Sequence, residues 1–307
     1  MNKNTQGNQG IPTLFPYGAA TQAEVINIIK MNCIESDVQN LSKTMADWRI
    51  ASNLYLSIVN KESGIPDTIN TKPIEIAYKS KLESISADVL FQQTFSYLQT
   101  EFQLVEINKL VAAQRLVNLD HVQRLKATLP KNPSMGDLID FCLAPKNSPP
   151  EPKVLQLAQN AYSFNSESAD FRFLGGFAKP LSNDDIKVAG GGKPVASIVL
   201  LVGYGSAISN AYLVKNRIIL NNGFHRMFTL ADMGIQYAPV LIQKISNPDL
   251  EFPPHISGLP KDYLIDNPRP VIMKDFVDKT LFTVISKKPT MKNLQIAWNA
   301  QETSTPI

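Results

Sequence analysis

The sequence predicts an α+β fold, in which a helical N-terminal region precedes a small mixed sheet. In residues 21–63, apolar side chains recur every three to four positions, which is the period of an amphipathic helix. In residues 195–245, short apolar runs alternate with Gly, Asn and Pro, as strands and turns do. Helical and strand segments are therefore separated along the chain, which is typical of the α+β class.

The chain is expected to begin with a flexible tail over residues 1–20, followed by a helical region over 21–100. Thr21 and Glu24 have the spacing of a capping box, which marks the start of a helix. Residues 74–100 are ambiguous, because their first part alternates like a strand and their second part fits a helix.

A second helix start is expected at Ser36 and Gln39, and its helix should close near Gly64. An apolar stripe lies behind this start and is interpreted as core. Its members are Val38, Leu41, Met45, Trp48, Tyr55, Ile58 and Val59.

A core domain is expected over residues 101–246. It opens with a strand at 102–107, and Asn118 or Asp120 then starts a helix that Pro130 ends. Residues 131–192 are rich in Pro, Asn, Ser and Gly, so we expect an insertion there with one helix at 153–162.

The second half of the core is expected to contain two hairpin-linked strands at 195–205 and 211–223, a helix at 225–233 and a strand at 239–245. Residues 247–307 form a proline-rich C-terminal extension. Within it, 281–285 and 294–298 are expected to pair as a hairpin.

Composition restricts the class of protein without naming an activity. The 307 residues carry a net charge of +3 and contain no run of five basic residues, so a polyanionic partner such as DNA is permitted but not required. Cys33 and Cys142 form no CxxC pair, which argues against a disulfide framework or a metal site. The polar N-terminus and the lack of an 18-residue apolar run predict a cytoplasmic protein with no membrane partner.

The stretch Asn221-Asn222-Gly223-Phe224-His225-Arg226 is expected to bind an anion. Gly223 allows the backbone to turn sharply between a strand and a helix. The first amides of a helix lack partners and attract negative charge, and an arginine beside them adds a planar donor fork for phosphate.

This stretch and the segment after it, 227-MFTLADMGIQYAPVLI-242, resemble the core of the ParB/sulfiredoxin-like superfamily. The upstream segment 105-VEINKLVAAQRLVNLDHVQRL-125 is similar to the first ParB box, and the two boxes occur in the family order. The resemblance implies a small mixed-sheet core that binds a nucleotide or phosphate. In that family ParB proteins bind CTP, sulfiredoxins bind ATP and free-serine kinases transfer phosphoryl groups.

By this resemblance, the phosphate-binding residues are Asn222, Gly223, Phe224, His225 and Arg226. Gln114 and Arg115 match the arginine loop of the first box. Phe224 stands where sulfiredoxin has its catalytic cysteine and ParB commonly has glutamate, so sulfinic-acid reduction is not expected and ParB-type hydrolysis is in doubt. No helix-turn-helix domain is evident after residue 246.

Three functions therefore stay open. The first is a nucleotide- or phosphate-binding protein, extending to a weak hydrolase or kinase, with Mg²⁺ entering together with a nucleoside triphosphate. General acid–base chemistry would then fall to His225, Glu106 or Asp120. The second is a DNA-associated ParB-like protein or nuclease, and the third is a non-catalytic interaction module.

Overall fold

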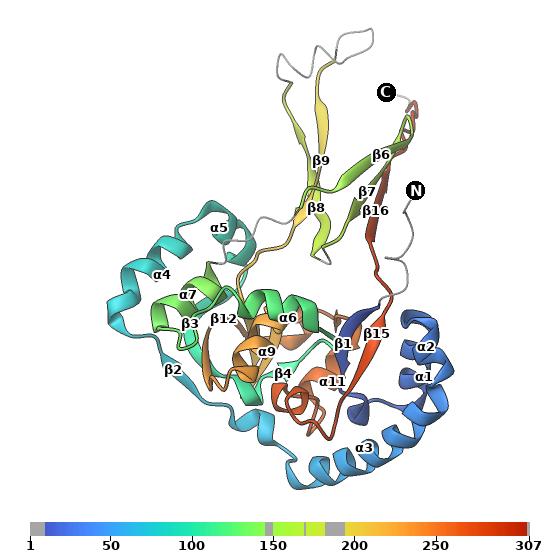
Figure 1. Ribbon diagram of the computed structural model, residues 1–307. Coiled ribbons are helices and arrows are strands. Elements are labelled where there is room, and N and C mark those ends of the chain that lie inside the picture. Colours follow the sequence, from blue (N-terminus) through green and yellow to red (C-terminus); the bar gives the residue numbers. More distant parts are fainter. Residues whose placement is uncertain (1–9, 145–149, 169, 182–193, 306–307) are drawn as a thin grey trace. The chain divides into compact units, whose positions relative to one another are not determined.

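The computed structural model describes residues 10–144, 150–168, 170–181 and 194–305 (Figure 1). The chain divides into two compact units. Unit 1 consists of Met1–Lys146 and Ala207–Pro289, and unit 2 consists of Asn147–Ser206 and Thr290–Ile307. Helices and mixed sheets occur together, so the α+β class expected from the sequence is what the structure shows.

The N-terminal part of unit 1 is mostly helical. The capping box of Thr21 and Glu24 forms as expected at the start of α1. The helices are α1 (Gln22–Asn32), α2 (Glu35–Gln39), α3 (Leu41–Lys61), α4 (Lys79–Ser86) and α5 (Val89–Phe95), with 3-10 turns η1 (Tyr17–Ala19), η2 (Ile65–Thr68) and η3 (Ile76–Tyr78). The expected start at Ser36 is wrong, because α2 begins one residue earlier, after Ile34, and no side chain caps it.

A six-stranded sheet forms the centre of unit 1, in the order β2-β3-β12-β10-β11-β4. Its strands are β2 (Thr71–Pro73), β3 (Gln99–Glu106), β4 (Val111–Ala112), β10 (Asn210–Val214), β11 (Arg217–Asn222) and β12 (Tyr237–Ile245). Two neighbouring pairs run parallel, β10 with β12 and β11 with β4, and the other pairs run antiparallel.

Apolar side chains of successive strand residues enter clusters on opposite faces of this sheet, as the strand period of two requires. On one face Ala112 and Leu220 pack with residues of α6 (Leu119–Lys126), α7 (Met135–Leu143) and α9 (Phe224–Asp232). On the other face Val111 and Ile219 pack with Leu264 of α11 (Lys261–Ile265).

Several of the remaining short elements of unit 1 contribute residues to the two apolar clusters. The remaining short elements are η4 (Ile107–Lys109), α10 (Pro248–Glu251), β13 (His255–Ile256), β14 (Leu259–Pro260) and η5 (Met273–Phe276). A further three-stranded sheet has the order β15-β1-β5, from β15 (Thr283–Lys287), β1 (Ile11–Phe15) and β5 (Val117–Asn118). Residues 11–15, expected within a flexible tail, are thus the central strand of a sheet, while residues 1–9 lie outside the described residues.

Unit 2 is built from two small antiparallel sheets. One has the order β16-β7-β6 and the other is the ribbon β8-β9. The strands are β6 (Lys153–Ala158), β7 (Ala161–Ser166), β8 (Phe171–Lys179), β9 (Ser197–Tyr204) and β16 (Lys292–Ala297). The helix expected at 153–162 is therefore wrong, because that stretch contains β6, a turn and the start of β7. Of the expected insertion at 131–192, residues 145–149, 169 and 182–192 lie outside the described ones.

Two expected strand pairings are also wrong. The strand expected at 195–205 forms as β9 but pairs with β8, and the stretch 211–223 is itself the hairpin of β10 and β11, which turns at Lys215 with a φ of 56°. The expected C-terminal hairpin does not form, because β15 pairs with β1 in unit 1 and β16 pairs with β7 in unit 2. Local sequence carried no sign of these partners, which lie far away in the chain.

Candidate functional site

The expected anion-binding turn lies between β11 and α9. Gly223 is the N-cap of α9 and has a φ of 93°, in the left-handed region that favours glycine. A Cβ on Gly223 would lie 2.3 Å from Ser209 Oγ, so no larger residue fits there. The amide of Gly223 donates to Asn222 Oδ1 at 2.7 Å, and no side chain caps the first turn of α9.

The two sequence segments that resemble the ParB boxes lie side by side (Figure 1). Strand β4 is parallel to β11, with Ala112 opposite Leu220. The segments that follow the two strands therefore begin at the same end of the sheet, where both strands have their carboxyl ends. Helix α6 then begins at its N-cap Asn118, whose side chain accepts from the His121 amide at 3.0 Å. The N-termini of α6 and α9 are thereby brought together.

His225 joins these two helix starts. Its Nε2 accepts a hydrogen bond from the Asn118 amide at 3.1 Å, so the neutral ring carries its proton on Nδ1. The ring of His121 meets that of His225 edge-on, with centroids 5.1 Å apart. Sequence reasoning gave Asn118 only the role of a helix start, and the contact with His225 adds a second one.

Both imidazoles are held neutral. Burial, aided by the neighbouring His121 and Arg226, lowers the pKa of His225 to about 4. Burial, with Arg124 and Arg226 nearby, also lowers the pKa of His121. At neutral pH this corner of the molecule therefore has hydrogen-bonding imidazoles without positive charge.

Arg226 is buried, and its guanidinium reaches the C-terminal end of α7. Its Nη1 donates to the carbonyl oxygens of Cys142 at 3.0 Å and Phe141 at 3.3 Å. A cation at the negative end of a helix dipole stabilises it, so Arg226 has a structural role here in addition to any role toward a ligand.

The turn at Gly223 also lies next to two connecting segments of unit 1. The chain leaves unit 1 through the segment after α7 and returns through the segment before β10. The amide of Ser209 donates to the Cys142 carbonyl at 2.8 Å, which joins the outgoing and incoming segments. The side-chain amide of Asn221 donates to Asn210 Oδ1 at 2.8 Å, and that of Asn210 donates to the Ile208 carbonyl at 3.0 Å. These two bonds connect the motif to the incoming segment.

The candidate Arg115 of the first box is bonded away from the turn at Gly223. Arg115 donates to the Ala19 carbonyl at 3.2 Å, and its guanidinium lies 5.4 Å from the ring centre of Tyr263 on α11. These contacts belong to η1 and α11, whereas the carbonyl oxygens that Arg226 Nη1 contacts belong to α7. Gln114 lies two residues beyond Ala112, and its buried Oε1 has no hydrogen-bond partner among the described residues.

Of the two candidate carboxylates, Glu106 bonds to groups away from the turn, whereas Asp120 lies at the start of α6. Glu106 Oε2 accepts from the Asn70 amide at 3.1 Å and the Asn70 side chain at 2.9 Å, and lies 3.2 Å from Lys109. Asp120 is exposed in the first turn of α6. Phe224 is buried and packs edge-on against Phe276, at 5.0 Å between ring centroids.

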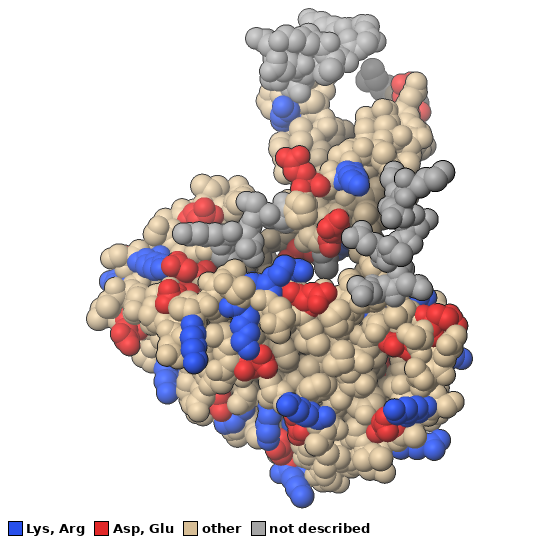
Figure 2. Space-filling view, in the orientation of Figure 1, with Lys and Arg blue, Asp and Glu red and all other residues tan. Residues whose placement is uncertain are grey.

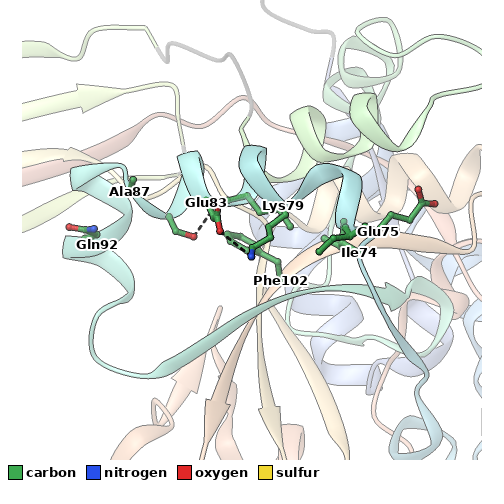
Figure 3. A pocket seen from close by; sticks show the side chains of 10 residues that line it. Ile74, Glu75, Lys79, Glu83, Ala87, Gln92 and Phe102 are labelled. Carbon is green, nitrogen blue, oxygen red and sulfur yellow. Dashed lines mark hydrogen bonds and ion pairs between the residues drawn. The ribbon is translucent and has the colours of Figure 1, made fainter.

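A separate pocket of about 520 Å³ lies in unit 1 between α4, α5 and β3 (Figure 3). Its floor is apolar, with Ile74, Leu82 and Phe102, and an ion pair of Lys79 and Glu83 at 3.7 Å lies beside it. Its lining, taken over the described part of the chain, contains none of the site residues expected from sequence.

Charged side chains of both signs are interspersed on the face shown in Figure 2. Within residues 10–144, 150–168, 170–181 and 194–305, no three His, Cys, Asp or Glu side chains gather closely enough to hold a metal ion. Over the same residues, every helix is too short or too polar to cross a membrane.

Comparisons with known proteins add no relative. A scan against protein-family models, a search of curated proteins and a search of solved structures each found no match to this chain. A proposal about function therefore rests on the geometry of the site alone.

Proposed function

We propose that the protein binds a phosphate-bearing ligand, such as a nucleotide, where α6 and α9 begin. The observation that supports this is the meeting of two helix N-termini beyond the ends of the parallel strands β4 and β11. Helix N-termini attract anions, and ligands of sheets with parallel strands bind beyond the carboxyl ends of those strands. An anion would offset the positive ends of both helices at once.

The donors in this proposal are backbone amides at the start of α9 rather than the guanidinium of Arg226. That guanidinium already bonds to two carbonyl oxygens of α7. Gln114 Oε1 lacks a partner among the described residues, but it is buried, so it is assigned no contact with the ligand. The resemblance of the two boxes to the ParB/sulfiredoxin-like superfamily favours a nucleotide over inorganic phosphate.

The proposal is for binding and assigns no reaction. Glu106 is bonded to Asn70 and Lys109, and His225 already accepts from Asn118, so neither is placed as a base toward a ligand at this turn. If a magnesium–nucleotide complex binds, the phosphates would supply most of the ligands of the metal.

The test is a thermal-shift titration with ATP, CTP, GTP and inorganic phosphate, with and without Mg²⁺, on wild type and three Asn→Asp variants. Asn222→Asp and Asn118→Asp add negative charge at the two helix starts but keep the side-chain oxygen that accepts a backbone amide. A ligand at a hundred times its Kd should stabilise the protein by about 2.7 kcal/mol. We expect one nucleotide to shift the wild-type Tm and both variants to weaken its binding at least tenfold.

The matched control is Asn247→Asp. Asn247 caps α10, and its Oδ1 accepts the Asp249 amide at 3.1 Å, so the same substitution is made at a helix start away from the site. This variant should keep the wild-type ligand shift. Equal shifts in all four proteins would place the ligand elsewhere, and no shift with any ligand at millimolar concentration would end the proposal.

A second candidate is a non-catalytic interaction module. The inward bonds of the motif favour it: His225 accepts from Asn118, Arg226 donates to α7, and Phe224 packs in the core. Under this alternative the motif only stabilises unit 1. No nucleotide would then change the Tm, and Asn222→Asp would raise it slightly through the helix dipole whether or not ligand is present.

A further inference from the structure

The ribbon of β8 and β9 exposes an unusual amount of apolar surface. Six of its side chains, Phe173, Leu174, Phe177, Ile198, Leu200 and Leu201, are between 39% and 79% exposed. They lie on both faces, because successive residues of a strand point to opposite sides. A two-stranded ribbon in water is marginal by itself, and contiguous exposed apolar surface marks an interaction site.

The two edges of the ribbon differ. Strand β8 (FRFLGGFAK) carries Arg172 and Lys179 near its ends, and its register shifts between Phe173 and Gly175, where Gly175 has a φ of 129°. Charges and bulges of this kind are what natural proteins place on edges to prevent pairing. Strand β9 (SIVLLVGY) has no charged residue and no proline, and one of its edges is unpaired within the described sheets.

We propose that two copies of the chain associate through their β9 edges, antiparallel about a two-fold axis. The two ribbons would then form one four-stranded sheet, with backbone hydrogen bonds across the centre. An isologous contact of this kind uses the same strand from each copy, so it closes as a dimer instead of growing into a fibre.

Charge and apolar side chains both fit a second copy. Arg172 pairs with Asp170 at 3.0 Å at the start of the ribbon, and β9 itself is uncharged, so two identical edges meet without repulsion. Ile198, Leu200 and Leu201 of β9 are all exposed. Pairing of two β9 edges brings these apolar side chains of one copy beside those of the other, as favourable cross-strand neighbours.

The first experiment is sedimentation velocity of the full chain over a hundredfold concentration range. We expect a monomer–dimer equilibrium in the wild type. Leu201→Lys places a charge in the middle of β9 and should weaken the dimer at least tenfold. Leu174→Lys is the matched control, since Leu174 is 51% and Leu201 44% exposed, but Leu174 lies at the irregular part of β8.

Circular dichroism and the emission of Trp298, which follows β16 in unit 2, verify that both variants stay folded. A wild type that is monomeric at every concentration would overturn the proposal, and so would equal weakening by the two lysines. The β9 edge lies in unit 2 and the proposed ligand site in unit 1, so Leu201→Lys should leave any nucleotide shift unchanged.

A cross-linking scan tests the geometry. Single cysteines at 198 to 202 would be treated with a short bismaleimide, and the native Cys33 and Cys142 are buried and should stay silent. Antiparallel pairing predicts that dimer yield peaks at one or two adjacent positions nearest the axis. An equal dimer yield at all five positions would overturn the strand pairing. If the wild type is monomeric and floats with neutral phosphatidylcholine vesicles, the proposal is overturned and the apolar surface is assigned to a membrane.

Discussion

In unit 1 the central sheet lies between two apolar clusters, whereas in unit 2 the ribbon of β8 and β9 leaves most of its large apolar side chains exposed. Charged groups differ in the same way. Unit 1 contains arginines that are almost fully enclosed, whereas Arg172 of unit 2 lies at the surface. The two units therefore use the same residue types for different purposes.

The clearest buried charges of unit 1 are Arg217 and Arg269. Arg217 forms a two-pronged bond with Asp67 at 2.9 Å for each contact and also donates to two backbone carbonyls. Arg269 contacts Asp275 at 2.7 and 2.9 Å and Glu62 at 2.9 Å, which ties the end of α3 to η5. Burying such groups is tolerable only because each has partners.

The largest expected difference in stability is between the loss of Arg269 from unit 1 and the loss of Arg172 from unit 2. Arg269→Met should destabilise unit 1 by about 3–5 kcal/mol, because it leaves the buried carboxylate of Asp275 without its partner. Arg172→Met in unit 2 should cost less than about 1 kcal/mol, because Arg172 and Asp170 are about half exposed. Urea unfolding measures both.

The two tryptophans allow each unit to be followed separately. Trp48 lies in α3 of unit 1 and Trp298 lies in unit 2, so a Trp→Phe change at one position leaves a single reporter for the other. If Arg269→Met moved the unit 1 transition no further than Arg172→Met moves that of unit 2, the buried ion network would not be a main source of stability.

A smaller effect is expected from pH, through His225. Its pKa is about 4 in the folded protein and near 6.5 when unfolded, so between these values the unfolded state binds the proton and the folded state does not. Stability is then complete above pH 6.5, falls as the pH drops toward 4, and changes no further below that. The loss should be on the order of 3 kcal/mol.

His225→Gln is the control for this titration. A glutamine oxygen can still accept from the Asn118 amide, but it does not bind a proton in this range. Denaturant unfolding of unit 1 between pH 4 and 7 should therefore be flatter in the variant. A variant as sensitive to pH as the wild type would assign the effect to His121 or to the carboxylates.

The sequence predicted local features well and distant pairings poorly. The capping box at Thr21, the helix that Asn118 starts and the strand–glycine–helix turn at Gly223 are all present, because each depends on neighbouring residues. The turn at Lys215 was missed because no glycine marks it. The pairing of β16 with β7 was missed because the two strands are brought together only by the folded unit.

The candidate site shows the same limit. The sequence located the turn and its residue types, but the structure determines which groups they face. The α7 carbonyls that Arg226 contacts are 84 and 85 residues away, and the partner of His225 is 107 residues away. From the sequence of the motif alone, the guanidinium of Arg226 and the imidazole of His225 are expected to face a ligand. In the folded chain both side chains form hydrogen bonds within the protein.

The smallest expected effect belongs to the exposed ribbon. Ile198→Ala in β9 should change the stability of unit 2 by less than about 0.5 kcal/mol at concentrations where the chain is monomeric, because Ile198 is 79% exposed. Ile219→Ala in β11 removes the same atoms from a fully buried position and should cost about 2–5 kcal/mol in unit 1. The free energies of unfolding are compared at low concentration with the tryptophan reporters. If Ile198→Ala lowers the free energy of unfolding only at concentrations where the dimer forms, the side chain of Ile198 contributes to association. A large loss of stability in the dilute monomer would instead show that Ile198 stabilises its own unit.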